Sequence, residues 1–163
     1  MKIKKNLNIL ISILLIFILD RISKEYILSH EQINNDESIV LNSFIKLDLV
    51  WNKGIAFGLL SFSNEIFYNI ITTIIMLIIG LLIFLILKNN SFKKYSYMLV
   101  CGGAFGNVFD RIVHQSVPDF IDLHYNSFHW FIFNIADIFI TIGVICLIIN
   151  EIFLENNKNE KKF

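Results

Sequence analysis

Four long apolar runs dominate this sequence and restrict the folds that are open to it. An α-helix needs about 20 mostly apolar residues to cross the hydrocarbon core of a bilayer. The four runs come close to that length, at residues 6–28, 66–87, 95–113 and 130–153. The chain has 163 residues, of which 55% are hydrophobic, and this is more apolar surface than one soluble core covers. We therefore expect an all-α integral membrane protein with four transmembrane helices, forming a single membrane-embedded domain over residues 1–163.

Lysines mark the ends of these runs. They cluster before the first run, between the second and third, and after the fourth, at Lys2, Lys4, Lys5, Lys88, Lys93, Lys94, Lys158, Lys161 and Lys162. By the positive-inside rule, both termini are expected in the cytoplasm. The first run could also be a cleavable signal peptide, but it continues into charged residues without a small-residue cleavage pattern, which favours an uncleaved helix. The formal net charge is zero, so charge gives no argument for nucleic-acid binding.

The segment between the first two runs is too polar to cross the membrane and is expected on the outer side. Residues 45–51 alternate between apolar and mostly polar side chains, which predicts a strand of a small outer β-sheet. The turn-forming residues that follow lead into apolar Ile55, Ala56 and Phe57, which predicts a loop lying on the bilayer. The second outer segment, residues 114–129, reads as a loop. It contains Asp119 and Asp122.

Charged side chains within a membrane span cost several kcal/mol unless they are paired or face water, so each is a candidate functional residue. Here they are Asp20, Arg21, Lys24, Asp110, Arg111 and Asp137. The helical rise places Asp20 roughly 12 Å, Asp110 roughly 5 Å and Asp137 roughly 10 Å from the outer ends of their predicted helices. Asp119 can fold back over the same region. A polar pocket open to the outer leaflet is therefore expected.

Structural roles are an alternative for several of these residues. Asp20 and Lys24 are four residues apart and could form a helix-end ion pair, and Asp110 and Arg111 could pair with other spans. Asp119 and Asp137 differ, because the sequence from residue 114 to 157 contains no lysine or arginine. Any cationic partner must come from elsewhere in the chain.

Two carboxylates brought together without a local cation share a proton, which is the state an aspartic protease requires. Asn107 and Asn134 each precede an acid by three residues and so are expected on the same helical face. They could orient the acid pair or the substrate backbone. Interhelical hydrogen bonding that holds the spans together is an equal alternative.

Other chemistries find little support. The sequence lacks the G-x-S-x-G and H-E-x-x-H motifs of serine and zinc hydrolases. The five-residue spacing of His124 and His129 is weak evidence for a metal site, and we expect both at the membrane interface. Cys101 and Cys146 lie in apolar runs and are expected to pack there. We expect neither a metal nor an organic cofactor.

Five motifs together resemble the bacterial lipoprotein signal peptidases, also called signal peptidase II or prolipoprotein signal peptidases. They cover nearly the whole chain: D-x-x-S-K at 20–24, N-x-G-x-A-F at 52–57, G-G-A-F-G-N-V-F-D-R at 102–111, V-P-D-F at 117–120 and F-N-I-A-D at 133–137. One such motif would be weak, whereas five in the family's order are specific.

The resemblance implies an intramembrane aspartic endopeptidase of the bacterial cytoplasmic membrane. Its substrates would be diacylglyceryl-modified prolipoproteins, cut immediately before the lipidated cysteine. Asp119 and Asp137 match the family's catalytic pair. Residues matching its substrate-binding or supporting positions are Asp20, Lys24, Asn52, Gly54, Asn107, Asp110, Arg111, Asn134 and Ala136.

Pro118 departs from the family pattern, which usually has an aliphatic residue there. Proline removes one N–H donor, so the local backbone geometry is expected to differ while Asp119 keeps its role. Asp122 could be mistaken for the catalytic acid, and Asp119 is preferred.

Two other classes of function remain to be separated from the peptidase. A small transporter or channel subunit would use its acids to move protons or cations. A noncatalytic chaperone or lipid-binding protein would use them only to join helices. With four spans and a self-contained site, the chain is expected to be a monomer in contact with membrane lipids.

Overall fold

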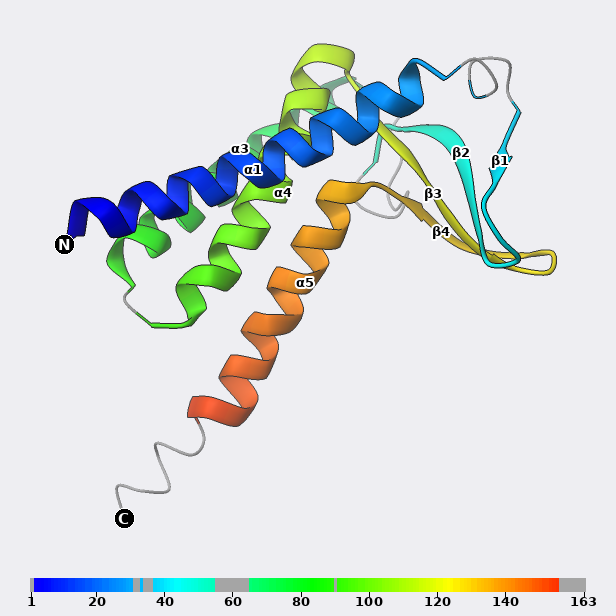
Figure 1. Ribbon diagram of the computed structural model, residues 1–163. Coiled ribbons are helices and arrows are strands. Elements are labelled where there is room, and N and C mark those ends of the chain that lie inside the picture. The colour runs from blue at the N-terminus through cyan, green and yellow to red at the C-terminus, as the bar shows by residue number, and fades with distance from the viewer. Residues whose placement is uncertain (1, 31–32, 34–36, 55–64, 90, 156–163) are drawn as a thin grey trace.

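In the residues that it describes, the computed structural model contains four α-helices and a four-stranded antiparallel sheet (Figure 1). The structure describes residues 2–30, 33, 37–54, 65–89 and 91–155. The helices are α1 (Lys2–Leu28), α3 (Glu65–Lys88), α4 (Lys93–His114) and α5 (Ile135–Ile149), and α5 continues into the π-helical segment η2 (Asn150–Glu155). The apolar loop expected at 55–57 lies outside the described residues. A helical protein with a small antiparallel sheet is thus confirmed.

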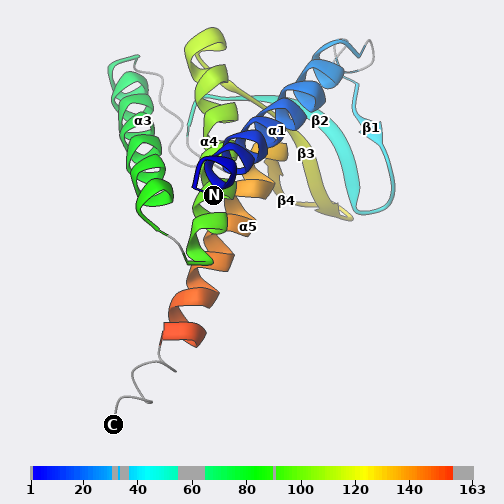
Figure 2. The ribbon, with the colours of Figure 1, turned by 60° about the vertical axis from the view of Figure 1, so that its left-hand side comes forward.

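Helix α4 is the centre of the helical layer and packs against α1, α3 and α5 (Figure 2). Its small residues explain why. A Cβ on Gly102 would meet Ile16 of α1, and a Cβ on Gly103 would overlap the carbonyl oxygen of Ala136 in α5. Because these positions lack side chains, the backbones of neighbouring helices can approach closely, as in membrane helix pairs.

The sheet has the order β1-β2-β3-β4, with every neighbouring pair antiparallel. Its strands are β1 (Ile39–Val40), β2 (Ile45–Asn52), β3 (Val117–Tyr125) and β4 (Phe128–Phe133). The predicted strand at 45–51 is confirmed. The prediction of a loop at 114–129 was wrong, because β3 pairs with β2 along most of its length and turns back into β4 at Asn126, which has φ 54°.

The fourth helix begins later than the sequence predicted. Trp130 belongs to strand β4, and α5 starts only at Ile135 after an extended Asn134. The run from Phe128 to Phe133 is mostly aromatic and aliphatic, and periodicity alone does not distinguish a strand from a helix in so short a run.

Two of the described helices are long and apolar enough to cross a membrane by length and composition, at Glu65–Lys88 and Ile135–Ile152. Helices α1 and α4 contain the charged residues noted above. Arg21 and Lys24 of α1 contact Asp110 of α4, while α1 exposes Leu10, Leu14 and Ile22 on its outer face. Because the charges are paired inside the protein and the outer surface is apolar, these long helices can contain charged residues and still face lipid.

Candidate active site

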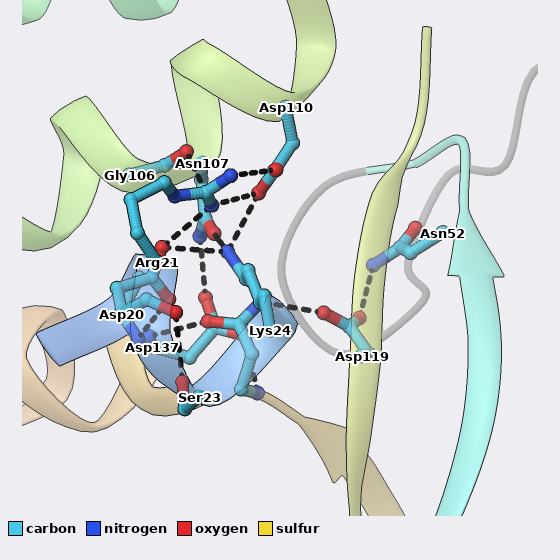
Figure 3. Close-up of polar contacts among 12 residues, drawn as sticks. Asp20, Arg21, Ser23, Lys24, Asn52, Gly106, Asn107, Asp110, Asp119 and Asp137 are labelled. Atoms are coloured by element: carbon cyan, nitrogen blue, oxygen red, sulfur yellow. Dashed lines mark hydrogen bonds and ion pairs between the residues drawn. The ribbon is translucent and has the colours of Figure 1, made fainter. Parts of the chain in front are cut away.

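Asp119 lies on strand β3, opposite Val50 of β2, and only 2% of it is exposed. Both of its carboxylate oxygens accept hydrogen bonds from side-chain amides. Asn134 Nδ2 donates to Oδ1 at 2.6 Å. Asn52 Nδ2 donates to Oδ2 at 2.9 Å, as Figure 3 shows. The carboxylate of Asp119 is thus held between the end of β2 and the start of α5.

Asp137 lies in the first turn of α5 and is 4% exposed. Asn134 is the N-cap of this helix: its side chain accepts from the backbone N–H of Asp137, and the carboxylate of Asp137 accepts from the backbone N–H of Asn134. This reciprocal capping box fixes the rotamer of Asp137. The predicted depth of 10 Å along a helix was wrong, because the residues before Asn134 form a strand.

Asn107 joins the two acids to the rest of the helical layer. Its Nδ2 donates to Oδ1 of Asp137 at 2.8 Å, while its Oδ1 accepts from Lys24 Nζ at 3.0 Å and from Asn134 Nδ2 at 3.2 Å. The prediction that Asn134 and Asp137 share a helical face was wrong, because Asn134 precedes the helix. Asn107 and Asn134 nevertheless both contact the candidate acids.

The two acids interact electrostatically. Burial and the nearby charge of Asp137 together raise the pKa of Asp119 to about 7, while the hydrogen bonds from Asn52 and Asn134 and the charge of Lys24 act to lower it. Both acids border one cavity of about 200 Å³. A carboxyl group with this pKa is partly protonated at neutral pH, so the pair can hold one proton between them.

Four charged residues form a buried cluster beside the acids. Lys24 Nζ contacts Oδ2 of Asp20 at 2.9 Å and Oδ2 of Asp110 at 2.7 Å, and Arg21 contacts the same two carboxylates (Figure 3). Asp20 and Asp110 are fully buried. The predicted i,i+4 pair of Asp20 and Lys24 is present, and it belongs to a larger network across α1 and α4.

Ala136 and Gly54 contribute through their backbones. The N–H of Ala136 donates to Oδ1 of Asp20 at 3.1 Å, which ties the first turn of α5 to α1. The N–H of Gly54 donates to Oδ1 of Asn52 at 2.7 Å, and its carbonyl accepts from the guanidinium of Arg111.

Arg111 is buried and borders the same cavity as the two acids. Its guanidinium lies over the ring of Tyr68, with 5.2 Å from Cζ to the ring centroid. Among the described residues, Nη1 of Arg111 has no hydrogen-bond partner. The structure thus brings every predicted site residue to one region, where a charged donor remains available.

Asp122 lies in a different cluster. Its Oδ2 is 2.7 Å from His129 Nδ1 and 3.4 Å from Lys46 Nζ, and it does not border the cavity that holds the two acids. His124 stacks on His129 with ring centroids 5.6 Å apart. No group of three potential metal ligands occurs in the described parts of the chain.

Pro118 is buried in β3 opposite Trp51, at a point where β4 does not yet pair with β3. A proline is tolerated where a strand has a partner on only one side, because one edge then needs no donor.

One charged residue of the buried cluster, Arg21, was given no role from the sequence. Its position within an apolar run was the only signal for it.

Comparison with known proteins identifies the class to which the chain belongs. A solved structure described as a bacterial membrane enzyme structure by the in meso method at 2.3 Å resolution superposes with a TM-score of 0.77. It is 32% identical to this chain and the match covers 96% of this chain and 93% of that one. The fold is therefore that of a bacterial membrane enzyme.

Sequence relatives make the assignment more specific. The family model for signal peptidase (SPase) II matches residues 12–153. The lipoprotein signal peptidase of Pelagibacter ubique (strain HTCC1062) is 53% identical over 94% of this chain and 92% of its own length. That of Wigglesworthia glossinidia brevipalpis is 42% identical over 96% and 99%. The chain belongs to the signal peptidase II family, and the expected lipoprotein signal peptidase activity is confirmed at the level of the family.

Proposed function

We propose that this chain removes signal peptides from diacylglyceryl-modified prolipoproteins, cutting immediately before the lipidated cysteine, with Asp119 and Asp137 as its catalytic acids. One observation supports this most directly. Two almost fully buried carboxyl groups, on β3 and α5, border one cavity and are held by three asparagine amides. A buried pair of this kind has the composition of an aspartic peptidase site.

The reaction needs one ionised and one protonated acid. The ionised carboxylate takes a proton from a water molecule as the water oxygen attacks the scissile carbonyl carbon, and the protonated acid donates a hydrogen bond to the carbonyl oxygen. When the tetrahedral intermediate collapses, the C–N bond breaks and the departing amine receives a proton. The pKa of about 7 for Asp119 supports a pair that holds one proton at neutral pH.

Several neighbouring groups suit the recognition of a peptide backbone. Nη1 of Arg111 lacks a partner among the described residues and belongs to a side chain bordering the cavity, so it can donate to a substrate carbonyl. Asn52 and Asn107 hold the acids with their amides. The remaining site residues hold the two acids, Asn52, Asn107 and Arg111 in place through the contacts described above. They are Asp20, Lys24, Gly54, Asp110, Asn134 and Ala136.

The proposed setting is the bacterial cytoplasmic membrane, crossed four times, with both termini in the cytoplasm and the site on the outer side. The exposed apolar face of α1 and the pairing of its charges with α4 support membrane insertion of these two helices. A substrate diacylglyceryl group gains about 0.8 kcal/mol per buried methylene, so its cleavage site would stay near the headgroups.

The chain is proposed to act as a monomer without a cofactor. All the groups required for hydrolysis by an acid pair come from one chain, and water is the only co-reactant. Contact with membrane lipids is expected for the outward apolar residues of the helices.

The decisive experiment is cleavage of a purified diacylglyceryl-modified prolipoprotein in detergent, followed by mass spectrometry of the products. Asp119→Asn and Asp137→Asn are each expected to lose at least about 1,000-fold in kcat, because loss of an ionisable acid removes proton transfer. Asp122→Asn is the matched control, since this acid is equally buried but belongs to another cluster.

Folding of each variant is checked by its thermal melt. Cleavage before the lipidated cysteine by the parent and by Asp122→Asn, but by neither of the other variants, would support the proposal. A folded Asp119→Asn or Asp137→Asn variant with near-parent turnover would contradict the role of that acid, and a parent that does not cleave would contradict the substrate.

A further inference from the structure

Arg21 is the one charged residue of the buried cluster that neither the motifs nor the proposed reaction assign. Its Nη1 donates to Oδ1 of Asp110 at 2.5 Å, and its Nη2 donates to Oδ2 of Asp110 at 2.7 Å and to Oδ2 of Asp20 at 2.8 Å. The guanidinium of Arg21 therefore binds the carboxylate of Asp110 on α4 in the bidentate manner. It also binds the carboxylate of Asp20, its neighbour on α1.

The surroundings of Arg21 hold it in this position. Its Nη2 also donates to the carbonyl oxygen of Gly106 at 3.3 Å. The ring of Phe109 lies 4.8 Å from Cζ and the ring of Phe17 lies 5.8 Å from it, and the two rings pack edge to face. The side chain is 16% exposed, so its charge is screened far less than that of a surface arginine.

The charges of the cluster balance only if Arg21 is present. Asp20 and Asp110 contribute two negative charges, and the cations in contact with them in the described structure are Lys24 and Arg21. Without Arg21 a buried net charge of −1 would remain, and Lys24 alone would have to neutralise both carboxylates. Buried unpaired charge is costly, so the cluster would rearrange around Lys24.

Lys24 connects this balance to the acids. The same ammonium group donates to Asn107 Oδ1 at 3.0 Å, and Asn107 Nδ2 donates to Asp137 at 2.8 Å. Asp20 in turn accepts from the N–H of Ala136, the residue before Asp137. The contact of Lys24 with Asn107 and that of Asp20 with the N–H of Ala136 therefore depend on the positions of Lys24 and Asp20.

We propose that Arg21 is a positioning residue for the peptidase reaction: by neutralising Asp20 and Asp110 together with Lys24, it keeps Lys24 against Asn107 and so keeps Asp137 aligned with Asp119. This inference rests on the proposed function of the acid pair. Arg21 does not border the cavity that holds the acids, so it acts through the intervening residues.

The inference predicts a shift in pH dependence. The charged groups around the acid pair come from α1 and α4 and are Asp20, Lys24, Asp110 and Arg111. Removing the positive charge of Arg21 makes these surroundings more negative, which favours the protonated forms of the acids. The pH profile of kcat/KM is therefore expected to move upward by on the order of one pH unit in Arg21→Gln.

Four variants test this with the prolipoprotein cleavage assay. Arg21→Lys keeps the charge and is expected to keep the position of the parent profile, with a lower kcat. Asp110→Asn is expected to move the profile downward, and the double variant Arg21→Gln/Asp110→Asn to return it to within a few tenths of a pH unit of the parent. Lys93→Gln is the control, because this lysine pairs with Glu151, far from the acids in sequence and on the cytoplasmic side of the proposed topology.

A folded Arg21→Gln variant whose profile superimposes on that of the parent would overturn the inference, and so would an equal shift in Arg21→Lys. If Arg21→Gln does not fold, the comparison of Asp110→Asn with the double variant still measures the effect of removing Arg21. Identical pH profiles of these two variants would equally refute the inference. Either result, with a parent that cleaves and an inactive Asp119→Asn, would leave the proposed function standing.

Discussion

The side-chain amide of Asn134 donates a 2.6 Å hydrogen bond to Asp119, and the same side chain accepts from the backbone N–H of Asp137 at 3.1 Å. One residue therefore holds both candidate catalytic acids and starts the helix that contains one of them.

The two duties of Asn134 are separable by mutation. Asp also caps helices well, so Asn134→Asp is expected to keep the cap of α5 while it loses the amide donor and places a further buried carboxyl group beside Asp119. We expect cleavage to fall by at least about 10-fold, since a lost hydrogen bond to a charged group is worth on the order of 1.5–3 kcal/mol. Asn134→Ala loses the cap as well, and the expected destabilisation is about 1 kcal/mol. Parent-like cleavage by Asn134→Asp would show that its amide is dispensable.

The raised pKa of Asp119 has a consequence for stability. Its pKa is about 7 in the folded protein against an ordinary value of 3.8, so the folded state binds this proton more tightly than the unfolded state does. The contribution is fully present below the unfolded pKa and is lost as pH rises through the folded pKa. The melting temperature of the parent in detergent is therefore expected to fall between about pH 5 and about pH 8.

Asp119→Asn removes this titration and is expected to melt at a temperature that varies less over the same range and exceeds that of the parent at the alkaline end. Melting curves of the two proteins, recorded side by side across the pH series, provide the measurement. Parallel pH dependences would contradict a raised pKa at this position.

The close contact of α4 with α5 predicts a strong effect of one added methyl group. A Cβ at Gly103 would overlap the backbone carbonyl of Ala136, which cannot move aside without shifting the turn that contains Asp137. Gly103→Ala is expected to destabilise the fold by about 1–3 kcal/mol and to reduce cleavage.

Gly80 offers the matched control. It lies within α3 and nothing stands within 4 Å of a Cβ placed there. Gly80→Ala is expected to raise the free energy of unfolding by about 0.5–1 kcal/mol, because alanine restricts the unfolded chain and favours the helix. Thermal melts of both variants test the pair, and equal effects of the two substitutions would count against the tight contact at Gly103.

A further prediction concerns Asn52. Its amide stabilises the ionised form of Asp119, and its side-chain oxygen accepts from Gly54. Asn52→Ala is expected to raise the pKa of Asp119 above its present value and to move the pH profile of cleavage upward. A profile that moves downward or stays in place would contradict this direction.

Much of this arrangement was predictable from residue patterns. The apolar runs indicated the helices, the alternation at 45–51 indicated β2, and the absence of cations from 114 to 157 singled out Asp119 and Asp137. The cation that acts on Asp119 comes from another part of the chain, as expected. It is Lys24 of α1, which donates to Asn107 beside the acids.

Other parts were not predictable from local sequence. Strand β3 contains a proline and two aspartates, residues that are depleted in strands, and it exists because β2 and β4 pair with it on either side. The start of α5 was misjudged because the aromatic residues of β4 continue directly into the apolar helix. Asn134, three residues before an acid, was the signal that could have corrected it.

The charged cluster shows a second limit. Arg21 and Asp110 are 89 residues apart in sequence, and no spacing rule predicts their contact. It follows from the packing of α1 on α4, which in turn depends on glycines whose neighbours are known only in three dimensions.

The two acids and Asn134 all lie on one continuous stretch of chain, formed by β3, β4 and the first turn of α5. Closing a short loop costs less chain entropy than joining distant segments, so this half of the site can assemble as soon as its own hairpin forms. Lys24, Asn52 and Asn107 come from the rest of the protein, on α1, β2 and α4. A designer who wished to move this chemistry to another membrane scaffold would therefore need to transplant a single hairpin and one helical turn, and then supply two amides and an ammonium group from the host.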